Sequence, residues 1–186
     1  MNYYEKPTMQ QEQAAAETKT FFAKHLNQFK GACDVLRDIE SNLSAIANDA
    51  LKAALLSPGR VIQTDDGAEW RHDVDLSKIT SICHRRTAAG LEFAVVECLP
   101  LKNGEMKEAL NSGHNLREVL QEFMRDQRQV LNLWKTDVTA GMREHLDEKF
   151  PGQNMDVVVE SFEYKLSRAI SETRAIAQSQ SRGIRI

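Results

Sequence analysis

The sequence has few of the residues that usually identify a specific chemistry. Its 3 cysteines form no CxxC pair and lie far apart, which argues against a zinc site and a disulfide framework. Its 9 glycines never cluster, so no glycine-rich phosphate-binding loop is present. No apolar run approaches the roughly 18 residues that a membrane-spanning helix needs. Aromatic residues make up only 6% of the chain, which suits helices packed through smaller apolar side chains.

The net charge limits the expected class of partner, and the N-terminal and cysteine patterns limit the expected compartment. A formal net charge of −3 over 186 residues argues against a dedicated nucleic-acid binder, although local basic patches can exist within such an average. The first residues lack the basic and apolar regions of a secretory signal. We therefore expect a cytoplasmic protein in which Cys33, Cys83 and Cys98 are reduced thiols. We expect no metal, no cofactor and no membrane partner.

An apolar stripe with heptad-like spacing organises the first part of the chain. Its members at intervals of seven residues are Phe22, Phe29, Leu36, Leu43 and Ala50. The stripe predicts one long amphipathic helix over residues 8–56, with a partner along its length. Gly31 lies inside it, but an interior glycine costs only about 1 kcal/mol relative to alanine, so we expect the helix to continue. Pro58 should end it.

Between residues 60 and 101 the pattern changes to that of strands. The Asp-Asp-Gly sequence at 65–67 is a strong hairpin signal, and residues 87–90 predict a second turn. Trp70 is the expected core residue of the first hairpin. The strand expected over 91–99 is apolar on both faces, which predicts that both are covered. Residues 76–85 are consistent with either a strand or a helical turn.

The rest of the chain is again helical in pattern. Residues 105–110 have a helical composition, and longer helices are expected over 116–150 and 155–178. Residues 1–7 and 179–186 are expected to be tails. The predicted fold is mainly α, of the α+β type. It is an elongated bundle of long antiparallel helices, formed by residues 8–56 and 103–178, with a small antiparallel β-sheet insertion at 60–101. We expect these parts to form a single structural unit.

The sequence offers few candidate reactive groups. In a regular strand His72 and Val74 would share one face and Asp73 and Asp75 the other, so these residues should not converge. Adjacent strand residues also point apart, which argues against a dyad of Cys83 with its neighbour. We therefore predict no catalytic residue. A basic group remains as a candidate contact for an anion or nucleic acid, and it consists of Lys78, His84, Arg85 and Arg86.

A second candidate site lies on the first helix. The proposed interface residues are Phe21, Phe22, Leu26 and Phe29. Adjacent aromatic residues on a helix point about 100° apart, so one partner helix cannot easily bury both Phe21 and Phe22. An exposed apolar patch of this kind marks an interface. We therefore expect this segment to mediate self-association, most simply as a homodimer, or docking on another protein.

These observations favour a non-enzymatic structural or interaction protein. It would be a helical homo-oligomer, or an adaptor subunit that docks on a larger protein assembly. One alternative is a nucleic-acid-associated accessory protein that uses the basic turn around Arg85 and Arg86. Another is an enzyme whose site lies where the sheet meets the helices. A deep polar pocket with perturbed titratable groups would favour the enzyme.

Overall fold

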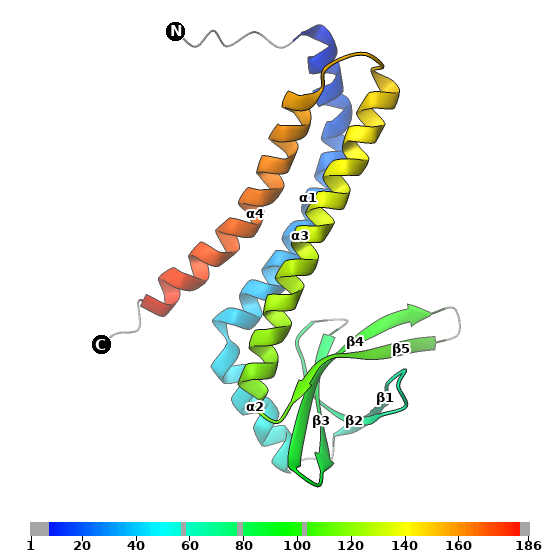
Figure 1. Cartoon of the computed structure of the whole chain (residues 1–186). Coiled ribbons are helices and arrows are strands. Elements are labelled where there is room, and N and C mark those ends of the chain that lie inside the picture. Colours follow the sequence, from blue (N-terminus) through cyan, green and yellow to red (C-terminus); the bar gives the residue numbers. More distant parts are fainter. Residues whose placement is uncertain (1–7, 57–58, 78–79, 102–103, 183–186) are drawn as a thin grey trace. The chain divides into compact units, whose positions relative to one another are not determined.

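The computed structural model describes residues 8–56, 59–77, 80–101 and 104–182 (Figure 1). Among these, the side chains of residues 20–22, 98–101, 104–107 and 172–182 are outside the description. The chain forms two compact units. The first, called the helical unit, contains the chain up to residue 34 and from residue 129 onward. The second, called the sheet unit, contains residues 35–128.

The expected helix over residues 8–56 is interrupted, but not at its glycine. Helix α1 spans Met9–Ser41 and passes through Gly31, and α2 spans Leu43–Leu56. The break falls at Asn42, whose side-chain Nδ2 donates to the carbonyl oxygen of Asp38 over 2.9 Å. The Asn42 backbone N–H donates to the same oxygen over 3.2 Å. Short polar side chains compete with helical hydrogen bonds in this way, whereas Gly31 only lowers helix propensity.

The helical unit is built from the first part of α1, the second part of α3 (Leu116–Lys149) and α4 (Asp156–Arg182). The helices expected over 116–150 and 155–178 are thus observed as α3 and α4. Phe29 stacks on Trp134 with ring centroids 5.4 Å apart. Ion pairs link Lys149 to Glu17 over 2.6 Å and Arg143 to Asp156 over 2.6 Å. The other buried apolar side chains include Cys33, Val138, Met142, Leu146, Val159, Phe162 and Leu166.

The sheet unit contains a five-stranded antiparallel sheet with strand order β1-β2-β3-β4-β5. Its strands are β1 (Arg60–Gln63), β2 (Glu69–Asp75), β3 (Thr80–Thr87), β4 (Gly90–Leu101) and β5 (Gly104–Gly113). The two predicted turns are present, and each has a glycine with positive φ, Gly67 at 78° and Gly90 at 113°. The helix expected over 105–110 is wrong, because these residues form β5. Pairing along β4 overrides their helical composition.

Both faces of the sheet carry buried side chains. One face carries a buried cluster of Ile62, Trp70, Cys83, Ala94 and Val96, so the prediction for Trp70 is confirmed. On the other face Ile82, Phe93 and Val95 are buried. Helix α2 packs against β2 and β3, and its buried residues are Ala50 and Ala54. Small residues at these positions let the helix approach the strands closely.

The expected elongated bundle with a small sheet insertion is wrong. The sheet has five strands and forms the centre of its own compact unit, which includes α2 and the adjoining ends of α1 and α3. Within that unit the Asn111 side chain donates to Asp126 on α3 over 2.9 Å. Only the mixed α+β character agrees with the prediction. Among the described residues, no helix is long and apolar enough to cross a membrane.

Candidate anion-binding site

An irregularity in β2 determines which polar side chains meet. Arg71 pairs with His84 and His72 with Cys83, but the register then shifts, and Val74 pairs with Ile82. Asp73 is the extra residue of this β-bulge, and a bulge breaks the alternation of side chains between the two faces. Asp75 therefore lies beside His72, with His72 Nε2 2.8 Å from Asp75 Oδ1. The expectation that these two residues lie on opposite faces is wrong for this reason.

Asp73 itself lies on the face of Arg71 and meets His84 on the neighbouring strand. His84 Nδ1 lies 2.5 Å from Asp73 Oδ1 and 2.6 Å from Oδ2. The two side chains are 5% and 1% exposed, so water does not compete for this contact. Burial raises the pKa of the Asp73 carboxyl, and the hydrogen bond and charge of His84 oppose that rise. The result is a buried carboxylate–imidazole pair, called the Asp73–His84 pair below.

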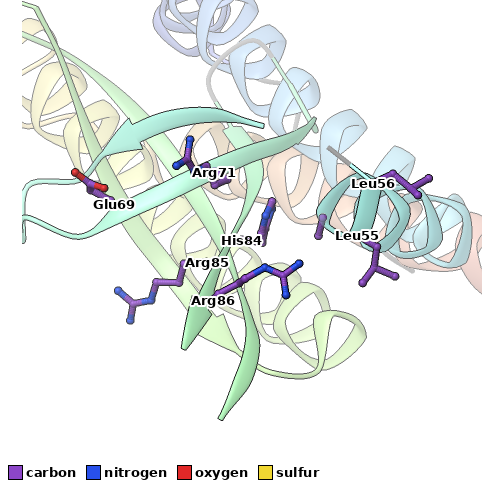
Figure 2. Close-up of a pocket in the computed structure, with 8 residues that line it drawn as sticks. Leu55, Leu56, Glu69, Arg71, His84, Arg85 and Arg86 are labelled. Atoms are coloured by element: carbon purple, nitrogen blue, oxygen red, sulfur yellow. The ribbon is translucent and has the colours of Figure 1, made fainter. Parts of the chain in front are cut away.

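His84 also borders a pocket of about 520 Å³ between the end of α2 and the strands β2 and β3 (Figure 2). Its volume lies in the range of about 300–1,000 Å³ found for ligand sites. The helix contributes Ala54, Leu55 and Leu56. The strands contribute Glu69, Arg71, His84, Arg85 and Arg86. The pocket thus has an apolar wall and a mainly cationic wall.

Two arginines flank His84 on the cationic wall. Arg71 is its direct cross-strand partner, and such partners have Cβ atoms about 5 Å apart. Arg86 lies two residues further along β3 on the same face, which corresponds to about 7 Å. Figure 2 shows His84 between the two arginines. In the part of the chain that the structure describes, neither Arg71 nor Arg86 forms an ion pair.

Arg85 points to the face of the sheet opposite that of Arg86, because successive strand residues alternate between the two faces. Its guanidinium lies 4.3 Å from the ring centroid of Trp70. Its Nε donates to Glu92 Oε2 over 2.6 Å. The structure therefore places His84 and Arg86 on one face of β3 at the pocket. Arg85 also contributes to the lining, but its guanidinium is engaged by Trp70 and Glu92. Lys78, the fourth predicted residue, is outside the described residues.

Sequence reasoning missed Arg71, Leu55, Leu56 and the role of Asp73. Arg71 joins the site only through the register of β2 on β3, and the two leucines only through the packing of α2 on those strands. Neither relation is visible as a spacing along the chain. The predicted hairpin turns could have indicated these pairs, because antiparallel pairing around a turn brings distant residues opposite one another. The bulge, however, left no signal in the sequence.

The structure describes the side chains of only two of the four interface residues predicted on α1. Phe29 is buried and stacks on Trp134, so it belongs to the core of the helical unit. Leu26 is half-buried. The side chains of Phe21 and Phe22 are outside the description. Among the described residues no group of His, Cys, Asp and Glu is arranged to hold a metal ion.

A second hollow, of about 390 Å³, lies within the helical unit between α1, α3 and α4. Its lining includes Ala15, Met142 and Phe162, with charges of both signs at Glu12 and Lys165. This lining has no counterpart to the three arginines of the sheet-unit pocket, which outnumber the single acid there, Glu69. The pocket of the sheet unit is therefore the stronger candidate.

Comparison with known proteins identifies no related protein. No protein-family model, curated protein or solved structure matches the chain. The function must therefore be argued from the geometry of the pocket.

Proposed function

We propose that this protein is a non-enzymatic interaction protein whose sheet unit recognises an anionic group on a partner protein. One observation supports this most directly. Arg71 and Arg86, neither with an ion-pair partner among the described residues, flank His84 in a pocket of about 520 Å³. A charged side chain without a nearby ion-pair partner is not neutralised, so its full charge can attract an incoming ligand.

The apolar wall of the pocket supports a protein partner. Leu55 is 59% exposed and Leu56 is 84% exposed at the end of α2, and Leu51, one turn earlier, is 42% exposed. Leucines grouped beside two arginines fit a segment that carries an anionic group next to an apolar side chain. Apolar contact supplies the affinity in such an arrangement, and the charges fix the orientation.

A peptide titration tests this proposal. The protein labelled with ¹⁵N is titrated with a short peptide that carries an acidic group beside leucine, and with the same peptide made neutral by amide substitution. We expect the Arg71 and Arg86 side-chain Nε–H signals to shift with the acidic peptide only. The substitutions Arg71→Gln and Arg86→Gln should each weaken binding about tenfold, which corresponds to the loss of one charge-assisted hydrogen bond.

Arg125→Gln is the matched control. Arg125 belongs to the same unit, and its side chain is 65% exposed on α3, outside the pocket. Its substitution changes the net charge by the same amount, so it should leave peptide affinity unchanged. An equal loss for all three variants would indicate attraction by overall charge and would refute recognition in the pocket.

Nucleic-acid binding is the competing outcome of the same experiment. Contacts to two arginines release few counterions, so a pocket-bound anion should show a shallow dependence on salt. An oligonucleotide that binds more tightly than the acidic peptide, with a steep salt dependence, would replace the proposal with the accessory-protein alternative.

An enzyme is the second candidate, and the Asp73–His84 pair favours it. A histidine oriented by a buried carboxylate is a common general base. The described lining of the pocket, however, offers no serine, threonine or cysteine as a nucleophile. Catalysis would therefore require an activated water. Hydrolysis of a chromogenic phosphate ester that is lost in His84→Asn but retained in Arg125→Gln would favour the enzyme over the binding role.

Self-association and a cytoplasmic location stay predictions. Burial of Phe29 limits the proposed dimer contact to Phe21, Phe22 and Leu26. Changing Phe21 and Phe22 together to serine should convert a dimer to a monomer without loss of helix, as measured by sedimentation and circular dichroism. Wild-type protein that stays monomeric at high concentration would contradict self-association. The cytoplasmic proposal is supported by Cys33 and Cys83, which are buried thiols in different units.

A further inference from the structure

The protonation of His84 determines what the pocket can bind. Its Nδ1 faces both oxygens of Asp73, so the proton on that side lies between the two residues. When the pair holds one proton, Nε2 is a bare acceptor and the pair carries one negative charge. When it holds a second proton, Nε2–H becomes a donor toward the pocket and the pair is neutral. An anion cannot hydrogen-bond to Nε2 in the first state.

The charge of the site follows from these two states. Arg71 and Arg86 contribute two positive charges, since arginine stays protonated. The lining also includes Glu69 and Arg85, whose opposite charges cancel, so with one proton on the Asp73–His84 pair the remaining three groups sum to a single positive charge. With two protons they sum to two positive charges and present three sets of N–H donors. Spacings of about 5 Å and about 7 Å along the sheet place these donors around one small tetrahedral anion.

We propose that the pocket binds a phosphoryl group as its dianion, together with one proton taken up by the Asp73–His84 pair. This inference rests on the proposed function and adds the class of the ligand and its dependence on pH. A dianion matches the doubly positive state in charge and its three terminal oxygens match the three donors. A carboxylate has one charge and two oxygens, so it leaves one arginine unpaired.

The surroundings of His84 support uptake of the proton by this pair. From β2 the charged groups are Asp73, Arg71 and Glu69, and His72 acts on Asp73 through its charge. From β3 there is Arg86, from β4 the cross-strand partner is Phe93, and α2 contributes only apolar residues to the pocket. Burial raises the pKa of Asp73, so this carboxyl accepts a share of the proton more readily than an exposed one.

Sulfate is the probe that distinguishes a proton taken up by the protein from one bound by the ligand. It has the shape and charge of a phosphoryl dianion, and it stays doubly charged from about pH 6 to about pH 8.5. A phosphate ester, in contrast, takes up a proton of its own near about pH 6. Sulfate, phenyl phosphate and acetate are titrated into the wild-type protein by calorimetry. At about pH 8 the titrations are repeated in two buffers of different ionisation enthalpy. The difference in heat gives the number of protons taken up per bound anion.

We expect uptake approaching one proton per sulfate, and an affinity that falls up to about tenfold per pH unit toward the alkaline end. In Asp73→Asn the neutral amide can donate to Nδ1, which leaves a proton on Nε2 without any uptake. That variant should bind sulfate with an affinity that is independent of pH and with no proton uptake. The buffer comparison on the wild type does not depend on the variant's stability.

Three results would overturn the inference. Sulfate affinity that is independent of pH, with no proton uptake by the wild type, would remove the proton linkage and leave the proposed anion recognition intact. Acetate that binds more tightly than sulfate and phenyl phosphate would remove the phosphoryl class and also leave it intact. Failure of sulfate, phenyl phosphate and the acidic peptide to bind at any pH would refute the proposed function itself.

Discussion

The Asp73–His84 pair allows a quantitative test of what stabilises the sheet unit. Both side chains are at least 95% buried, with the Nδ1–carboxylate distances at 2.5 and 2.6 Å. Removing one partner of a buried pair leaves the other without compensation, which costs about 3–5 kcal/mol. We expect Asp73→Ala near the lower end, because it removes the buried carboxylate itself. His84→Ala should lie near the upper end, because it leaves a buried carboxylate.

The double variant distinguishes this pair energy from simple loss of packing. Additive losses would sum to about 6–10 kcal/mol by the same estimate. With both groups removed no buried charge remains, so the double variant should recover about 2–3 kcal/mol of that sum as a coupling energy. An additive double variant would refute the reasoning, because it would mean that the two groups do not stabilise each other.

The two tryptophans make this measurement specific to one unit. Trp70 is 2% exposed in the sheet unit, and Trp134 belongs to the helical unit. In a Trp134→Phe background, urea denaturation followed by tryptophan fluorescence reports on the sheet unit alone. The slope of the transition must be equal in all four proteins of the cycle for the free energies to be compared.

The pH dependence gives an independent check with a defined sign. The raised pKa of Asp73 in the folded state means that its contribution to stability is full below the unfolded pKa of about 3.9. That contribution is lost as the pH rises through the folded-state pKa. His84 lowers the pKa of Asp73, so His84→Ala should extend the loss to higher pH. A variant whose stability is insensitive to pH between about 4 and about 7 would contradict this.

Three further predictions follow from local geometry. Gly59→Ala should destabilise the sheet unit by about 1–3 kcal/mol in urea denaturation, because φ is 63° and a Cβ would lie 2.8 Å from the carbonyl oxygen of His72. Glu108→Gln should raise the stability by about 0.2–1 kcal/mol at neutral pH, since Glu108 faces Glu97 across β4 and β5, and its charge adds to burial in raising the pKa of Glu97. The gain should vanish in acid, where Glu97 is protonated; a gain that persists there would exclude repulsion as its cause. Asp75→Ala should cost at most about 1 kcal/mol above the unfolded pKa of about 3.9 and nothing well below it, because hydrogen bonds from His72 and Ser81 lower the pKa of this exposed carboxyl. Melting curves at both pH values test that sign.

Local patterns predicted the elements of this fold better than their assembly. The hairpin turns were found because aspartate and glycine favour backbone conformations that other residues avoid. The helices after residue 116 were found because their apolar residues recur along one face. The helix predicted over residues 105–110 is wrong because their composition favours a helix, and only pairing with β4 makes them part of a strand. That pairing joins residues that local composition does not relate.

The size of the sheet does not follow from the sequence, for a related reason. The apolar stripe of residues 8–56 suggested that helix packing dominates the whole chain. In the structure, α2 uses Ala50 and Ala54 from that stripe to cover β2 and β3. A stripe specifies that a face is buried, but it does not specify whether a helix or a sheet buries it. The pattern therefore predicted the helical partner of Phe29 correctly, but for the part of the stripe that forms α2 the partner is a sheet.

The candidate site depends on one residue that no pattern identified. Without the bulge, Asp73 and Asp75 would lie on one face of β2, as their alternation predicts. With it, Asp75 bonds to His72 and Ser81, and Asp73 bonds to His84. The extra residue thus separates two nearby acids into different environments, so burial raises the pKa of Asp73 while hydrogen bonds lower that of Asp75. Bulges are frequent beside functional sites because they re-aim a side chain without changing the fold. Here the bulge re-aims Asp75 toward His72 and Ser81. Asp73 stays on the face of Arg71 and holds His84 between two arginines, which makes the pocket sensitive to a proton.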